Sequence, residues 1–222
     1  GIGIYTYSGV REKYDINSTL LANPFESSNF DLTLLQQRIA PTLAVKLTDY
    51  LSVGGSYIRA YQTFAWGTPY QFQNTVHPVS LDGVNFYSDL DTDGWGHGGQ
   101  FGGLLKFGEH TRVGISYTTQ MKVRLQGRQE VTLRNNPGLV GFGITDGTRT
   151  NYNTALTWRY PQALATGVTH TLGDRWLVSF DWQWVDWSRA NDAQHYILSE
   201  GSNPTVNGVV AAVGGSPDGG IR

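Results

Sequence analysis

Apolar and polar residues alternate along much of the chain, and no stretch shows a convincing helical period. Alternation with a period of two predicts β-strands that have one apolar and one polar face. The clearest runs cover residues 113–125, 152–172 and 176–185, and weaker runs cover residues 1–8, 32–48, 51–65 and 95–107. The sequence therefore predicts an all-β protein with about seven strands.

The segments between these strands alternate in length. Short polar turns are predicted at residues 48–50, 108–110 and 173–175, and long loops rich in Gly, Asn, Asp and Pro at 9–30, 67–94, 128–149 and 189–222. Long strands with short turns at one end and long loops at the other are typical of an outer-membrane β-barrel. An immunoglobulin-like sandwich has shorter strands and lacks this asymmetry. We expect the long loops to lie outside the cell and the turns to face the periplasm.

The tryptophan-rich run at residues 176–185 supports a membrane-facing strand. Trp176 and Trp184 share one face and lie about 26 Å apart along an extended strand, or about 20 Å along the membrane normal at a tilt of about 40°. This separation is close to the height of the apolar band on such barrels. We expect the two indoles to lie in the two aromatic girdles, with Val178 and Phe180 in hydrocarbon between them.

Composition narrows the possible partners. The net charge is −2 and only 15% of residues are charged, so no basic surplus indicates binding to nucleic acid. The absence of cysteine excludes disulfides, thiolate metal sites and a cysteine nucleophile. No apolar run approaches 18 residues, so no transmembrane helix is predicted. Because the chain begins at Gly1 rather than at Met, we expect a processed chain or a fragment.

Three segments resemble a known family. "YPQALATGVTHTLGDRWLVSFDWQWVDWS" (160–188) contains a P-x5-G-V, an L-x-D-x-W and a W-S pattern. "DGWGHGGQFGGLLKFGEHTRVGISYTTQMKVRLQG" (93–127) and "APTLAVKLTDYLSVGGSY" (40–57) carry W-G-x-G, T-R-x-G-x-S-Y and S-x-G-x-S patterns. The order and content of these segments are similar to the long-chain fatty-acid transporters of the bacterial outer membrane (FadL type), whose relatives include transporters of toluene and other aromatic hydrocarbons.

The resemblance implies an antiparallel transmembrane β-barrel of fourteen strands in the outer membrane, monomeric and closed by an N-terminal plug. In that family the plug, with its Asn-Pro-Ala segment, would precede Gly1, and further strands would follow Arg222. The resemblance therefore implies that residues 1–222 are a single incomplete barrel segment. The implied partners are a hydrophobic small molecule and the outer-membrane lipid or lipopolysaccharide.

Motifs for catalysis or metal binding are weak. "DLDTDG" (89–94) matches the first half of a calcium loop, but Gln100 stands where the bidentate acid is needed, so a solvated acidic loop is the better interpretation. The histidines lack ligand spacing, and no nucleophile motif is present. We therefore predict no enzyme activity, no metal and no cofactor. The glycines at 96, 98, 102 and 103 are expected to permit close strand approach.

The candidate ligand-binding cations are Lys122, Arg124 and Arg159, on the polar face that we expect to point inward, and Arg59, whose strand alternates poorly. A cation beside an apolar groove can dock a substrate carboxylate. The alternative is ordinary lumen charge, solvated or paired with Asp181.

Aromatic residues in the same region can form the apolar groove: Phe64, Trp66, Tyr70, Phe72 and Phe86. Alternatively, they pack the long loop. Three functions remain open at this point: passive uptake of hydrophobic compounds, a structural or adhesive barrel without transport, and a soluble carbohydrate-binding sandwich.

Overall fold

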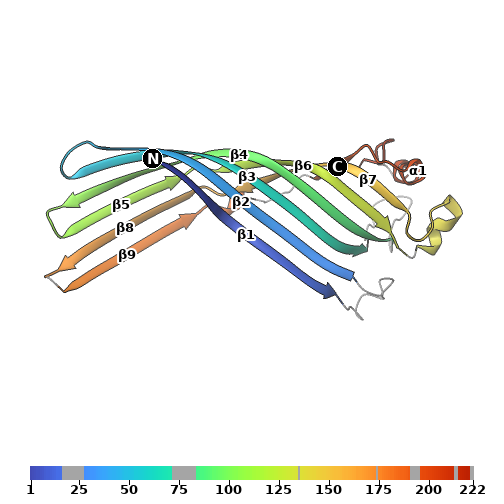
Figure 1. The fold of residues 1–222 in the computed structure, drawn as a ribbon, viewed down its shortest axis with the longest axis horizontal. Helices are drawn as coiled ribbons and strands as arrows, with labels where there is room; N and C mark the ends of the chain where they lie inside the picture. Colours follow the sequence, from blue (N-terminus) through green and yellow to red (C-terminus); the bar gives the residue numbers. More distant parts are fainter. Residues whose placement is uncertain are drawn as a thin grey trace.

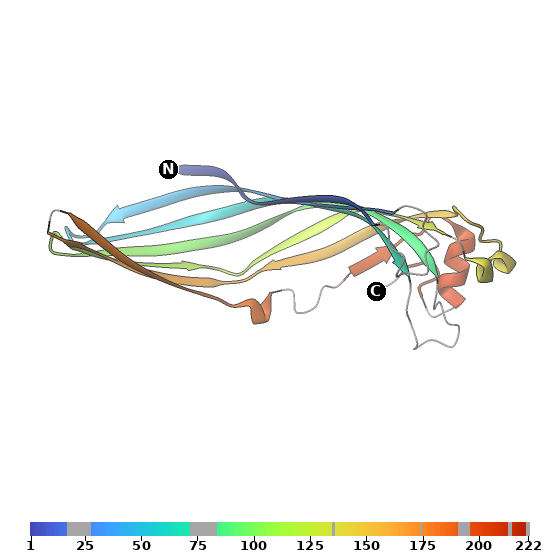
Figure 2. The ribbon, with the colours of Figure 1, turned by 90° about the horizontal axis from the view of Figure 1, so that it is seen from below.

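The computed structural model describes residues 1–16, 28–71, 84–134, 136–173, 175–190, 196–212 and 215–220. They form one elongated, curled antiparallel sheet with the helical segments 137–142 and 204–212 at one end (Figures 1 and 2). The strands are β1 (Ile2–Ile16), β2 (Ser28–Lys46), β3 (Leu51–Gln71), β4 (Asn85–Phe107), β5 (Thr111–Thr118), β6 (Met121–Leu133), β7 (Arg149–Tyr160), β8 (Ala163–Leu172), β9 (Trp176–Val185) and β10 (Tyr196–Ser199). The helices are α1 (Pro204–Ala212) and the 3-10 helices η1 (Pro137–Phe142) and η2 (Trp187–Arg189).

Strand β4 is long enough to pair with two strands in succession. Its C-terminal part pairs with β5 and its N-terminal part with β6; β5 continues the sheet to β8 and β9, and β6 continues it to β7 and β10. Each of the seven predicted strands is therefore found, with β5–β6 and β7–β8 each forming one interrupted path. The predicted loops at 9–30, 67–94 and 128–149 were too long, because β1, β4 and β6 extend into them. The residues in these extensions are polar and lack the apolar alternation that predicts a strand.

The two ends of the sheet differ, as predicted. Tight turns at residues 48–50 and 108–110 lie at one end, while η1 and α1 lie at the other (Figure 1). The third predicted turn contains Asp174, which lies outside the described residues. Within the described ranges, no helix has the length and apolarity needed to cross a membrane. We call the two parts of the sheet the turn half (40–57, 98–118 and 163–185) and the loop half (28–39, 58–71, 84–97, 121–133 and 149–160).

Ring contacts between distant strands show how strongly the sheet curls. Tyr7 on β1 and Tyr160 on β7 have ring centroids 6.1 Å apart. On a flat sheet these strands would be separated by about 24 Å, at about 4.8 Å per strand. Phe64 on β3 and Trp158 on β7 are likewise only 5.4 Å apart. The face that carries these four rings is therefore concave, and we call it the inner face.

Glycines permit the close approach of β4 and β6. At Gly96, one of the glycines predicted for this role, a Cβ would lie 2.7 Å from the carbonyl oxygen of Lys122. A Cβ on Gly94 would lie 1.8 Å from the carbonyl oxygen of Arg124, and one on Gly127 would lie 2.0 Å from that of Asp91. Any side chain at these positions would push the strands apart. The sheet can bend here only because both residues are glycine.

A β-bulge separates the two halves of the β5–β6 path. Gln100 is opposite Thr118, but His97 is opposite Lys122, so three steps on β4 match four on its partner. One extra residue turns every following side chain to the other face. The neighbouring path is interrupted at the same level by Pro161 and the residue after it. The predicted single alternation over 113–125 is therefore wrong.

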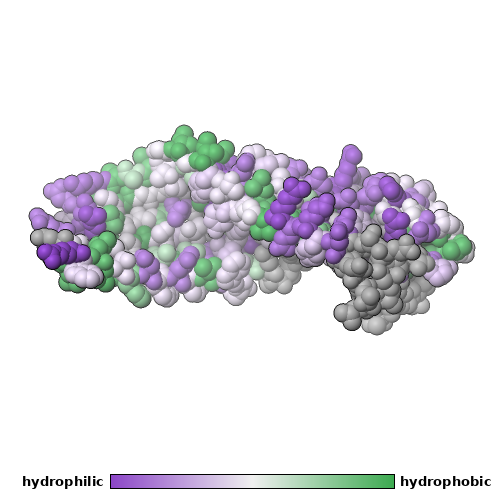
Figure 3. Space-filling view, turned by 60° about the horizontal axis from the view of Figure 1, so that its bottom comes forward, coloured by the Kyte–Doolittle hydropathy of each residue, from purple (hydrophilic) through white to green (hydrophobic). Residues whose placement is uncertain are grey.

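The character of the two faces inverts between the halves. In the turn half the outer face is apolar: Leu43, Val45, Val53, Tyr57, Phe101, Leu105, Val113, Ile115, Tyr117, Leu164, Val168, Trp176, Val178, Phe180, Trp182 and Trp184. In the loop half the outer face carries polar residues that include Asp89, Asp91, Asp93, His97, Lys122, Arg124 and Arg128. Figure 3 shows hydrophobic patches toward the turn end and hydrophilic residues gathered over the loop half.

Candidate hydrophobic binding site

The inner face of the loop half is apolar and tightly packed. Its buried cluster contains Ile58, Ala60, Phe64, Leu90, Met121, Val123, Leu125 and Leu156, together with Ala40 from the adjoining end of the turn half. Several strands contribute because the alternating residues of each strand point to the same concave side. The curl then brings them together from across the sheet.

Five aromatic rings form a continuous track along this inner face. Centroid distances are 5.4 Å from Trp158 to Phe64, 5.9 Å from Phe64 to Trp66, 5.8 Å from Trp66 to Tyr70 and 5.7 Å from Tyr70 to Phe86. These spacings are typical of favourable ring pairs. The track runs toward the end of the sheet that carries the long connections, since Phe86 lies near the start of β4.

Four of the five residues predicted to form a groove are thus brought together, and Phe72 lies outside the described residues. That they bind a ligand remains a prediction. Trp158 was not among the candidates, although the alternation of its strand was recognised. Only the curl of the sheet shows that its ring meets Phe64, so no local pattern could have identified it.

A buried polar cluster lies beside the track. Arg38 is only 5% exposed, and its Nε donates to Gln36 Oε1 at 2.8 Å. Gln36 Nε2 and the Tyr160 hydroxyl both donate to Gln62 Oε1, at 3.0 and 2.8 Å. The Arg38 guanidinium also lies over the ring of Tyr7, 3.2 Å from its centroid. Sequence analysis missed Arg38, whose inward direction follows from its pairing opposite Ala60.

This cluster has more donors than acceptors. Gln62 Nε2 is buried and has no hydrogen-bond partner, and the same is true of Trp66 Nε1 on the aromatic track. Among the described residues, no carboxylate lies within ion-pair distance of Arg38. Buried donors without acceptors are uncommon in folded proteins. The arrangement suits a ligand that accepts hydrogen bonds, a carboxylate above all.

The four candidate cations all lie on the outer face, although Lys122, Arg124 and Arg159 were predicted to point inward. In the register of the sheet, Arg59 lies opposite His97, His97 opposite Lys122, and Lys122 opposite Arg159. Arg124 occupies the next outward position on β6. The prediction was wrong for Lys122 and Arg124 because the bulge reverses the face that was extrapolated from β5. The Arg59 guanidinium lies over the outward Trp95 ring, 4.8 Å from its centroid.

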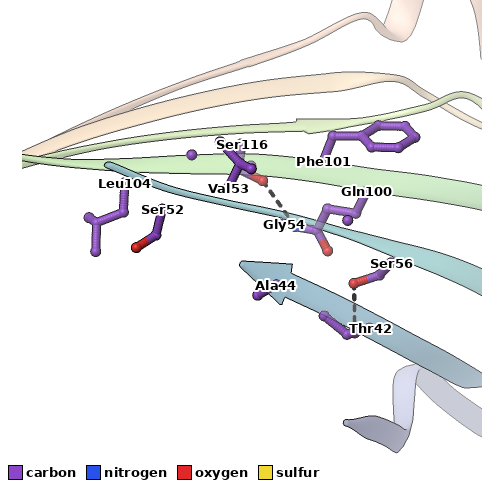
Figure 4. A pocket seen from close by; sticks show the side chains of 13 residues that line it. Thr42, Ala44, Ser52, Val53, Gly54, Ser56, Gln100, Phe101, Leu104 and Ser116 are labelled. Carbon is purple, nitrogen blue, oxygen red and sulfur yellow. Dashed lines mark hydrogen bonds between the residues drawn. The ribbon is translucent and has the colours of Figure 1, made fainter. Parts of the chain in front are cut away.

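The turn half offers a different inner surface, with small and polar side chains. Thr42 and Ser56 hydroxyls lie 2.7 Å apart, and Gln100 Nε2 donates to Ser116 Oγ at 3.0 Å (Figure 4). These residues line a depression of about 340 Å³ together with Gly54 and other small residues. The inner wall therefore changes from aromatic to small and polar between the two halves.

The acidic segment 89–94 is a strand rather than the predicted loop. Asp89, Asp91 and Asp93 are exposed on the outer face of β4, while Leu90 is fully buried on the inner face. The alternation of acidic residues with Leu90 and Thr92 is the strand pattern that the acidic composition obscured. Their carboxylates are solvated, as predicted.

A curled antiparallel sheet with an apolar outer band, aromatic rings at that band and a contrasting inner wall is typical of an outer-membrane β-barrel. The comparison with protein families identifies the family of outer-membrane proteins to which the chain belongs. Residues 1–207 match the family described as outer membrane protein transport protein (OMPP1/FadL/TodX), so the chain belongs to this family. The soluble-sandwich hypothesis is thereby excluded. No curated protein matches the chain in sequence.

Solved structures share the fold. The Ralstonia pickettii toluene transporter TbuX is 22% identical with a TM-score of 0.73, covering 91% of this chain and 55% of TbuX. The Pseudomonas putida toluene transporter TodX is 18% identical with a TM-score of 0.63, covering 89% and 53%. A Pseudomonas aeruginosa FadL homologue is 14% identical with a TM-score of 0.64, covering 89% and 51%. The chain spans about half the length of these structures.

Proposed function

We propose that the protein is an outer-membrane channel for the passive uptake of hydrophobic compounds, such as aromatic hydrocarbons or long-chain fatty acids. The observation that carries this proposal is the inward aromatic track of Trp158, Phe64, Trp66, Tyr70 and Phe86. It supplies apolar surface in the part of the barrel whose outer face is charged and solvated. Such surface allows a hydrophobe to leave water before it reaches the membrane.

The inner wall also supports movement of the hydrophobe. Each ring of the track is within 6 Å of the next, so a small aromatic molecule can exchange one ring contact for another. The small polar residues of the turn half hold an apolar molecule weakly, which favours release. Structural similarity to two toluene transporters agrees with this proposal.

Uptake of labelled toluene by cells that carry the protein in their outer membrane tests the proposal. The double substitution Phe64→Ala/Trp66→Ala removes two inward rings, and a ring contact contributes about 0.5–1.5 kcal/mol beyond burial, so each loss should weaken binding about 2- to 12-fold. The matched control is Tyr61→Ala/Trp95→Ala, which removes an outward ring pair from β3 and the neighbouring strand β4. Equal effects of both changes would refute an inward route.

The buried cation distinguishes two substrate classes. We propose that Arg38 receives the carboxylate of a fatty acid, because its guanidinium and the free Gln62 donor lie beside the aromatic track. A charge-assisted hydrogen bond contributes about 1.5–3 kcal/mol, so Arg38→Gln should weaken fatty-acid binding about 10- to 150-fold. Toluene uptake should be unchanged. If neither ligand responds, Arg38 is structural and the channel recognises apolar bulk alone.

The alternative function is a structural or adhesive barrel without transport. It predicts no difference in toluene uptake between cells with and without the protein. That outcome would remove the proposed channel, whatever the variants do.

A further inference from the structure

A β-bulge on β1 adds an aromatic ring to the inner face. The register between β1 and β2 shifts between Thr6 and Ser8, and Tyr7 is the extra residue on β1. The extra residue of a bulge has no partner in the ladder, and bulges re-aim side chains next to functional sites. The Tyr7 ring meets that of Tyr160 edge to face across the concave side of the sheet. The bulge therefore brings a ring inward at a position that simple alternation does not assign.

The rings of Tyr7 and Tyr160 both lie against the guanidinium of Arg38. Its central carbon is 3.2 Å from the Tyr7 centroid and 5.8 Å from the Tyr160 centroid. Both distances are within the limit of about 6 Å for a cation–π interaction. A guanidinium stacks on an aromatic face through its own plane, so the N–H groups at its edge can still donate. The rings therefore restrict where Arg38 points and leave its donors available.

The buried polar cluster fixes one edge of the same guanidinium. Arg38 Nε donates to Gln36 Oε1 at 2.8 Å, and Gln36 Nε2 donates in turn to Gln62 Oε1. Among the described residues, neither terminal nitrogen of Arg38 has a hydrogen-bond or ion-pair partner. Two such nitrogens can bind one carboxylate through two parallel hydrogen bonds. The cluster thus orients Arg38 while its terminal N–H groups stay free for a ligand.

We propose that Tyr7 is a positioning residue that orients Arg38 toward the carboxylate of a fatty acid. This inference rests on the proposed role of Arg38 in binding that carboxylate. An arginine side chain has many rotamers, and ordering it when a ligand binds lowers the affinity. The Tyr7 ring and Gln36 order the guanidinium before the ligand arrives. Because Tyr7 acts through the charge of Arg38, it should favour fatty acids over uncharged chains of the same length.

The test uses the folded protein in detergent, titrated with palmitic acid and, separately, with hexadecanol, an uncharged chain of the same length. The readout is the ratio of the two affinities, which a general loss of packing would not change. Tyr7→Leu should lower this ratio about 3- to 10-fold, the cost of ordering one long side chain. Tyr7→Phe keeps the ring and should retain the ratio of the parent.

Tyr14→Leu is the matched control on the same strand. Tyr14 is also half-exposed on the inner face, but its ring stacks on Phe30 rather than on a cation. Its replacement should leave the ratio unchanged. Heat-dependent mobility on gels checks that each variant is folded, and Tyr7→Met, which also removes the ring, repeats the measurement.

A double variant shows whether Tyr7 acts through Arg38. In the Arg38→Gln background, Tyr7→Leu should change the ratio less than about 1.5-fold, because no charge remains to be oriented. Equal effects of Tyr7→Leu in both backgrounds overturn the inference, and so does an unchanged or increased ratio in Tyr7→Leu alone. Either result leaves the role of Arg38 intact if Arg38→Gln by itself lowers the ratio. An unchanged ratio in Arg38→Gln removes both proposals.

Discussion

Phe101→Arg tests whether the outer face of the turn half contacts lipid, because the loss of stability should be much larger on that face than on the inner face. Phe101 is outward on β4 and 57% exposed, midway between Trp95 and Phe107. Those two aromatics are about 41 Å apart along the strand, or about 31 Å along the membrane normal at a tilt of about 40°. Phe101 is therefore near the bilayer midplane.

The expected cost follows from this depth. An arginine at the midplane of a barrel's lipid face destabilises it by about 2–4 kcal/mol. The ring also covers Gly55 and Gly99, whose ideal Cβ positions lie 3.1 and 3.3 Å from it, so this cover is lost as well. At about 1.4 kcal/mol per factor of ten, the ratio of unfolded to folded protein should rise about 30- to 700-fold.

Gln100→Arg is the matched control, one residue away on the inner face. It gives up one hydrogen bond to Ser116, a loss of about 0.5–1.5 kcal/mol, and places the new charge among small polar residues. Denaturant titration in lipid vesicles, followed by tryptophan fluorescence, gives both free energies of unfolding. Equal losses for the two variants would mean that the outer face of β4 does not contact lipid.

Two further predictions concern the bend and the orientation. Gly127→Ala should destabilise the protein by about 1–3 kcal/mol because its Cβ would meet backbone atoms of β4, whereas Gly138→Ala, with nothing within 4 Å, should have little effect on the denaturation midpoint. The chain has no native cysteine, so single cysteines can be labelled selectively. Gly141→Cys in η1 should react with a membrane-impermeant maleimide on intact cells, and Glu109→Cys in a turn should not. Labelling of position 109 alone would mean that the protein has the opposite orientation in the membrane.

The strands and their asymmetric connections were predictable because alternation is a local property. In the run at 176–185, the polarity of each side chain indicates the face of the sheet on which it lies. The register places Phe180 opposite Val168 and Trp184 opposite Leu164 on the outer face, as predicted. The aromatic groove was predictable in part, since Phe64 and Trp66 are two residues apart on one strand. Trp158 was not, because its contact with Phe64 depends on the curl of the whole sheet.

The largest error concerns the face of the sheet on which the cations lie, and one extra residue at the β-bulge causes it. Alternation counted from the outward-facing Val113 would place Lys122 on the inner face. The extra residue between Thr118 and Lys122 reverses that assignment. Polar composition cannot reveal the mistake, because a solvated outer wall and a water-filled lumen both accept charge. The same ambiguity hid Arg38, which lies in the apolar interior where a charge was not expected.

The strands invert their faces in two different ways, and both leave a trace in the sequence. On β5–β6 the apolar residues keep odd numbers throughout, and the bulge turns them from the outer to the inner face. On β3 the register with β4 is continuous, so the apolar positions must instead change parity, from Val53 and Tyr57 to Ile58 and Phe64. The adjacent pair Tyr57–Ile58 marks that change. The poor alternation of this strand is therefore itself informative, because it shows where a strand passes from the lipid-facing band to the solvated wall.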